Sequence, residues 1–115
     1  MAASLPLSDE QKLTVICRVE PGCLGPQGVN LIDAFCSFAQ PEIDLIDADF
    51  IHWQLTPRYD KKLPEMQYYI NNKTLTHDKA AKYLALFDRK LDNFEEHLNE
   101  KLADLIDLHL LKHSV

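Results

Sequence analysis

The hydrophobic and polar positions of this chain change period twice along its length. Before about residue 49 and after about residue 75, apolar residues recur every three or four positions, which is the spacing of amphipathic helices. Between Asp49 and Asn72 they alternate with polar residues, which is the spacing of strands with one buried face. The pattern therefore predicts an α+β fold with a short β segment between helical segments.

Two strands are expected in this middle segment. The run 50–56 contains the single tryptophan and puts Ile51, Trp53 and Leu55 on one face, and the run 65–71 alternates in the same way. We expect the two runs to pair antiparallel, with their apolar faces turned to the helices. This pairing would gather polar side chains on the opposite face, namely His52, Gln54, Gln67, Tyr69 and Asn71.

The sequence also predicts the connections around these strands. The segment from Pro57 to Pro64 is too long for a two-residue hairpin, so we expect a loop stiffened by its two prolines. Asn71-Asn72 predicts a turn, because asparagine tolerates positive φ better than most residues. Lys73–Leu75 would then return as a short third strand.

Two helices are expected before the strands. The first begins at Ser8, which forms a capping-box signature with Gln11, and ends before Pro21; its apolar stripe would be Leu13, Ile16 and Cys17. The segment 21–28 contains every glycine of the chain and predicts a tight loop.

The second helix is expected from Pro26 to about Gln40, where Pro41 ends it. Residues 42–49 fit either a short helix or an extended segment, and the pattern does not decide between them.

Two more helices are expected after the strands. Thr76 is a good N-cap for the third, and Asp92 with Glu95 repeats the cap signature for a fourth helix of roughly 20 residues. The predicted order is α-α-β-β-α-α: four main helices with a small two- or three-stranded antiparallel sheet. We expect one domain over residues 1–115, with 1–7 flexible at its start.

Composition narrows the classes of protein. The chain has 115 residues, 46% of them hydrophobic and 26% charged, as is ordinary for a folded domain. Its net charge of -6 disfavours general nucleic-acid binding, which needs clustered basic residues. The charge is uneven, because residues 57–90 sum to +4 and the remainder to -10. Such polarity favours association with a second copy or with a charged partner.

The cysteines and the apolar runs bear on the compartment. There are three cysteines, an odd number, and residues 1–20 contain no apolar core of signal-peptide length. No run approaches the roughly 18 apolar residues of a membrane span. We expect reduced thiols in a cytoplasmic protein.

Two features suggest reactive or metal chemistry only weakly. Cys23 lies near the expected start of the second helix, where a thiol pKa is lowered, so it is a candidate reactive thiol; an inert thiol in a structural turn is the simpler interpretation. His109 and His113 are spaced as a ligand pair, but no carboxylate supports them on that face. We therefore expect solvated histidines, with no metal site and no cofactor.

The polar face of the strands is a candidate ligand site. His52, Gln54, Gln67 and Tyr69 would line it, and a histidine there could act as a base near neutral pH. No serine, cysteine or carboxylate has a spacing that makes a nucleophile-base pair obvious. The alternative is the solvent side of an antiparallel sheet.

The loop before the second strand is a candidate partner site. It interleaves basic and aromatic residues, namely Arg58, Tyr59, Lys61 and Lys62. Such a loop can grip a phosphate backbone or an acidic protein, and the acidic remainder of the chain favours protein.

Three functions follow in order of preference. The first is a non-catalytic interaction or regulatory module that forms a homodimer, which would cover an exposed strand edge or the second face of the long helix. The second is a small-ligand-binding protein or minor enzyme that uses His52 and Tyr69. The third is weak nucleic-acid binding through residues 58–62.

Overall fold

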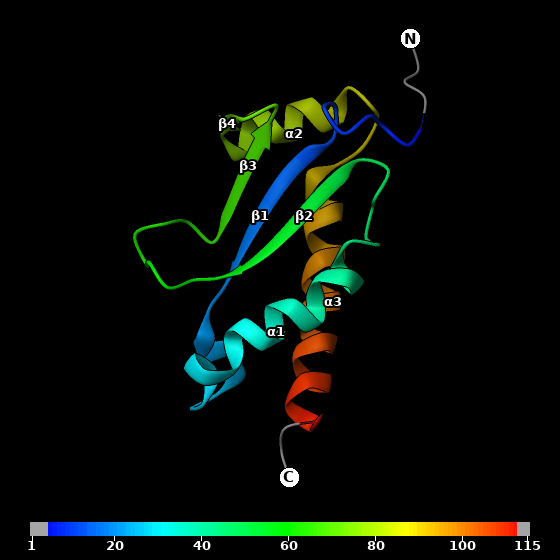
Figure 1. The fold of residues 1–115 in the computed structure, drawn as a ribbon. Coiled ribbons are helices and arrows are strands. Elements are labelled where there is room, and N and C mark those ends of the chain that lie inside the picture. The colour runs from blue at the N-terminus through cyan, green and yellow to red at the C-terminus, as the bar shows by residue number, and fades with distance from the viewer. Residues whose placement is uncertain (1–4, 113–115) are drawn as a thin grey trace.

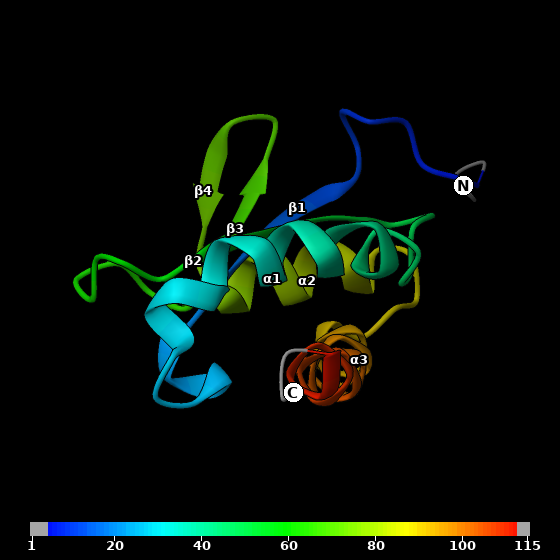
Figure 2. The ribbon, with the colours of Figure 1, turned by 60° about the horizontal axis from the view of Figure 1, so that its bottom comes forward.

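A four-stranded mixed sheet is the centre of the fold, and three α-helices lie on one side of it (Figure 1 and Figure 2). The computed structural model describes residues 5–112. Its elements are β1 (Leu13–Val19), the 3-10 helix η1 (Pro21–Leu24), α1 (Gly28–Ile43), β2 (Ile51–Pro57), β3 (Met66–Ile70), β4 (Lys73–Leu75), α2 (His77–Ala85) and α3 (Leu91–Lys112). The expected architecture of four helices with a two- or three-stranded antiparallel sheet is therefore wrong.

Most of the segment expected to be the first helix forms β1, one of the two interior strands of the sheet. The strand order is β2-β1-β3-β4, so β1 has a neighbour on each side. Burial alternates along β1, with Leu13, Val15, Cys17 and Val19 buried and the residues between them half-exposed. The capping-box residues Ser8 and Gln11 form only a local turn. Pairing on two sides, together with the β-branched residues Thr14, Val15, Ile16 and Val19, outweighs this local helix signal.

The two expected strands form, but they do not pair with each other. β2 runs parallel to β1, and β3 runs antiparallel to the other edge of β1. The connection from β1 to β2 runs through α1, as parallel neighbours require. The expected hairpin between residues 50–56 and 65–71 is therefore wrong, although the short strand β4 and the turn at Asn71 and Asn72, both at positive φ, form as expected.

The helix α1 begins and ends later than expected. It starts at Gly28 rather than at Pro26, and it continues past Pro41 to Ile43. Only glycine fits at position 28, because a Cβ there would lie 1.6 Å from the Pro21 carbonyl oxygen. Pro41 lies in the last turn, where one missing amide hydrogen does not prevent Asp44 N–H from bonding Gln40 O.

The helices after the sheet begin close to their predicted caps. The Thr76 hydroxyl accepts a hydrogen bond from the Lys79 amide at the start of α2. α2 ends at Ala85, and α3 begins at Leu91 with Asp92 in its first turn. No helix among residues 5–112 is both long enough and apolar enough to cross a membrane.

The core lies between the sheet and the helices. Ile51, Trp53 and Leu55 are buried there, as their alternation predicts. The Trp53 indole N–H donates to the Ile46 carbonyl at 2.8 Å, which ties the turns after α1 to the sheet. At the other end of the chain, Leu7 is buried and its amide donates to Asp49 O, while residues 1–4 of the segment expected to be flexible lie outside the described part.

The outer edge of β2 is covered by a side chain rather than by another strand. Gln40 of α1 donates from Nε2 to the Trp53 carbonyl and accepts at Oε1 from the Leu55 amide, each at 2.8 Å. Its amide group thus takes the place of a neighbouring peptide group. These two backbone groups of the β2 edge are therefore already hydrogen-bonded, which disfavours the addition of a further strand there.

Candidate functional site

The side of the sheet away from the helices brings together the residues predicted to bind a ligand. Thr14 of β1 lies between His52 of β2 and Tyr69 of β3, since it pairs with both. Ile16 lies in the same way between Gln54 and Gln67. Because residues directly opposite each other share a face of a sheet, the four predicted residues share the open face even though β1 separates their strands.

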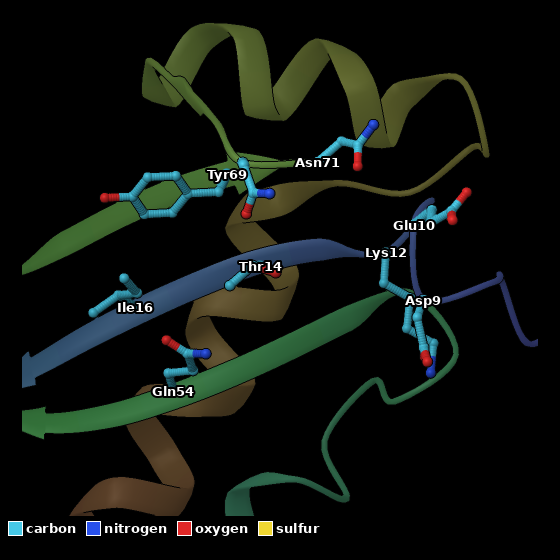
Figure 3. A pocket seen from close by; sticks show the side chains of 9 residues that line it. Asp9, Glu10, Lys12, Thr14, Ile16, Gln54, Tyr69 and Asn71 are labelled. Atoms are coloured by element: carbon cyan, nitrogen blue, oxygen red, sulfur yellow. The ribbon is translucent and has the colours of Figure 1, made fainter.

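A hollow of about 430 Å³ lies on this open face (Figure 3). Thr14, Ile16, Gln54 and Tyr69 rise from three neighbouring strands to form its floor. Its rim comes from the preceding turn and the β3-β4 turn, and consists of Asp9, Glu10, Lys12, Asn71 and Asn72. The volume falls in the range of small-molecule sites, but His52 and Gln67 lie outside the lining.

The polar groups beside the hollow are held by their neighbours. His52 Nε2 lies 3.2 Å from an Asp9 carboxylate oxygen, and both side chains are exposed. Gln67 Oε1 accepts from the Arg18 guanidinium, which also donates to Pro64 O. The chemistry available here is hydrogen bonding in contact with water, which suits recognition more than proton abstraction.

The predicted partner loop is held by its own arginine. Arg58 forms an ion pair with Glu20 and donates to the carbonyls of Lys61 and Leu63. Its guanidinium is therefore occupied in shaping the loop. Tyr59 donates to Asp33, and this hydrogen bond raises the pKa of the phenol.

Lys61 and Lys62 of this loop are exposed. No ion pair of either ammonium group occurs among the described residues. The structure therefore leaves two of the four predicted partner residues available for a charged contact.

The cysteines lie in two different environments. Cys23 is exposed in η1, a single 3-10 turn that offers less to an anion than the α-helix start that was expected. Cys17 and Cys36 are buried, and burial raises the pKa of their thiols to about 12 and about 11 respectively. The two buried thiols therefore stay protonated and act as small apolar side chains.

His109 of α3 is buried, although the sequence predicted a solvated histidine. It is only 3% exposed and packs its ring against Phe35 and Phe38, with centroids 5.4 and 5.3 Å away. The expectation of a solvated histidine is wrong at this position. His113, the other half of the spacing, lies outside the described residues.

A group of polar side chains that the sequence did not indicate joins β3, α2 and α3. Glu95 accepts from the Tyr68 hydroxyl and lies 2.9 Å from His77 Nε2, while Asp92 lies 3.9 Å from the same nitrogen. Burial, and then the Glu95 carboxylate, raise the pKa of Tyr68. Both Glu95 oxygens are engaged and Asp92 is exposed, so we assign the group a structural role.

A second surface missed by the sequence lies between the β3-β4 hairpin and α2. It is an apolar hollow of about 390 Å³, which we call the lysine-rimmed pocket. Its apolar residues are Ile70, Leu75, Tyr83 and Leu86, and its basic residues are Lys73, Lys79 and Lys82. Carboxylates are absent from this lining.

The floor of this pocket is fixed, whereas its rim is solvated. The Tyr83 hydroxyl donates to Gln11 O, and its ring packs edge-on against Phe87. Leu86 is 77% exposed at the mouth. Among residues 5–112, none of the three ammonium groups lies within ion-pair distance of a carboxylate.

One sequence signal pointed to this surface without resolving it. The excess of basic residues between 57 and 90 predicts a charged contact with a second copy or a partner, but it does not show which of these residues form one surface. The spacing of Lys79 and Lys82 puts them on one face of α2, and Lys73 joins them only through the fold of β4. That last step depends on tertiary structure.

Comparisons with protein-family models, with curated proteins and with solved structures find no match to this chain.

Proposed function

We propose that this protein is a non-catalytic interaction module, and that the lysine-rimmed pocket binds an acidic, amphipathic segment of a protein partner. The observation that carries this proposal is an apolar hollow ringed by three lysines without a carboxylate in its lining. Apolar side chains of the partner would fill the hollow, and carboxylates beside them would meet the ammonium groups. This combination is a recurring mode of helix-in-groove recognition.

The energetics favour such a partner over a purely polar one. Burial of apolar area supplies most of the affinity, while the lysines add long-range attraction and reject basic competitors. The rigid Tyr83 side chain loses little conformational freedom on binding. A cytoplasmic setting with reduced thiols remains part of this proposal.

The proposal is tested by titrating the isotope-labelled chain with a synthetic helical peptide. The peptide carries leucines three and four residues apart, with aspartates and glutamates beside them. We expect amide NMR shifts confined to β4 and α2, and binding weakened at least tenfold by Lys79→Glu with Lys82→Glu. Raising the salt from about 50 to about 500 mM should weaken binding as well, because these charges are exposed.

Two controls make the result specific. A peptide with asparagine and glutamine in place of the acids should bind more weakly, and Lys61→Glu with Lys62→Glu in the loop should leave the affinity unchanged. If the loop variant loses binding while the α2 variant keeps it, the partner surface is the loop and the pocket assignment is wrong.

A second candidate function rests on the hollow of the open face. Tyr69, Gln54 and Thr14 converge there on a space large enough for a small polar molecule. A thermal-shift screen with polar metabolites would find such a ligand as a stabilisation that Tyr69→Ala removes. The His52→Ala variant shows whether the neighbouring imidazole takes part.

A further inference from the structure

A surface of opposite charge to the lysine-rimmed pocket lies on α3 of the same chain. Acidic residues three or four positions apart recur along one side of this helix, so they share a face. They are Glu96, Glu100, Asp104 and Asp107, all exposed, and we call them the acidic face. None of them has an ion-pair partner among the described residues.

Leu108 adds an apolar group next to this face. It is 44% exposed and lies one helical turn after Asp104, so the two side chains are neighbours. The C-terminal half of α3 buries its apolar side in its own core and presents Asp104, Asp107 and Leu108 to solvent. Carboxylates beside an exposed leucine are what the lysine-rimmed pocket suits. We propose that the occupant of the pocket is α3 of a second copy of this chain.

The arrangement of the molecule supports a closed pair. The pocket, formed by β4 and α2, and the C-terminal half of α3 lie at opposite ends of a molecule 54 Å long (Figure 1). Two copies side by side in opposite directions bring each basic end to the acidic end of the other. A two-fold axis then makes the same contact twice, which ends the assembly at two chains.

Within each of the two surfaces like charges repel one another, and this contact reduces that repulsion. Like charges four residues apart on α3 repel one another, as do Lys79 and Lys82 on α2. Each set meets its complement in the pair, so the repulsion within both helices is relieved together. This inference rests on the proposed function, and it identifies the partner.

The test is the mass of the full chain in solution. At tens of micromolar in about 50 mM salt we expect sedimentation equilibrium to give two chains, and one chain in about 500 mM salt. Lys79→Glu with Lys82→Glu should give one chain in low salt, and so should Asp104→Lys with Asp107→Lys. An equal mixture of these two variants should give two chains again, since every contact in the mixed pair is between opposite charges.

The outcomes separate this inference from the proposed function. A one-chain mass for the unaltered protein in low salt overturns the second copy as partner, while the pocket can still bind the acidic peptide of the preceding experiment. Dimers that persist in both variants, or variants that do not recombine, also overturn it. Lys61→Glu with Lys62→Glu is the matched control and should remain a dimer.

Discussion

At the scale of single residues, ion pairs of histidine connect segments far apart in the chain. His97 of α3 lies with Nδ1 2.8 Å from an Asp47 oxygen, and Asp47 occupies the turns after α1 at φ 48°. The hydrogen bond to Asp47 and its negative charge raise the pKa of His97 above the ordinary 6.5. The imidazolium therefore helps to hold this turn against α3.

This pair predicts a pH dependence with a definite sign. Because the folded pKa of His97 is raised, its stabilisation is fully present below about pH 6.5 and is lost as the pH rises through the folded pKa. The difference in unfolding free energy between wild type and His97→Gln should therefore shrink from pH 6 to pH 9. Urea unfolding at several pH values measures the difference, and an NMR titration of Asp47→Asn should show the pKa of His97 falling. A gap that widens with pH contradicts the assignment.

At the scale of elements, the edge of β2 depends on one side chain. Gln40 satisfies both the Trp53 carbonyl and the Leu55 amide. A partly buried peptide group left without a partner costs about 1–3 kcal/mol. The edge would also become available for pairing with another chain.

We expect Gln40→Ala to lower the unfolding free energy by about 1–3 kcal/mol and to increase light scattering on heating. Gln40→Glu keeps an acceptor for the Leu55 amide but loses the donor to Trp53 O, so it should also destabilise. Ser37→Ala, one turn earlier and exposed, is the control and should change stability by less than about 0.5 kcal/mol. Equal stability of the Gln40 and Ser37 variants in urea would show that the clamp contributes nothing.

The elements also show what the sequence could and could not predict. The strands at 51–57 and 66–70 and the cap at Thr76 followed from alternation and local chemistry, which need no knowledge of the rest of the fold. β1 was missed because Ile16, on the open face, interrupts a strict alternation and supplies a helical spacing with Leu13 and Cys17. Its two neighbours come from distant segments, and that pairing decides its structure.

The candidate site was predicted in the same uneven way. The open face holds the four residues expected on it, because period two fixes the face of a strand whatever its neighbour. The partner loop was predicted from its composition, but Arg58 forms an ion pair with Glu20, which follows the neighbouring strand β1. The lysine-rimmed pocket needs β4 beside α2, which no local spacing reveals.

At the scale of the whole molecule, one core connects the sheet to all three helices. Leu98 of α3 is fully buried in it, whereas Leu45 in the turns after α1 is 75% exposed. We expect Leu98→Ala to lower the unfolding free energy by about 2–5 kcal/mol, and Leu45→Ala to change it by less than about 0.5 kcal/mol.

Urea unfolding of these two variants measures the changes in free energy and also reports whether the protein unfolds cooperatively. Trp53 fluorescence follows the sheet and far-ultraviolet circular dichroism follows mainly the helices, so coincident midpoints indicate one folding unit. Separate midpoints for the two signals in Leu98→Ala would show that α3 unfolds on its own.

The position of β1 has a consequence for how the protein is made. Of the four strands of the sheet, β1 leaves the ribosome first, and both of its neighbours are translated later, with β3 ending at Ile70. Until then the apolar residues of β1 that are buried in the folded protein remain exposed to solvent, so the nascent chain passes through a stage in which chaperones can bind it. Assembly of the sheet must wait until Ile70 has been translated, and this pairing between segments distant in the sequence favours slow folding.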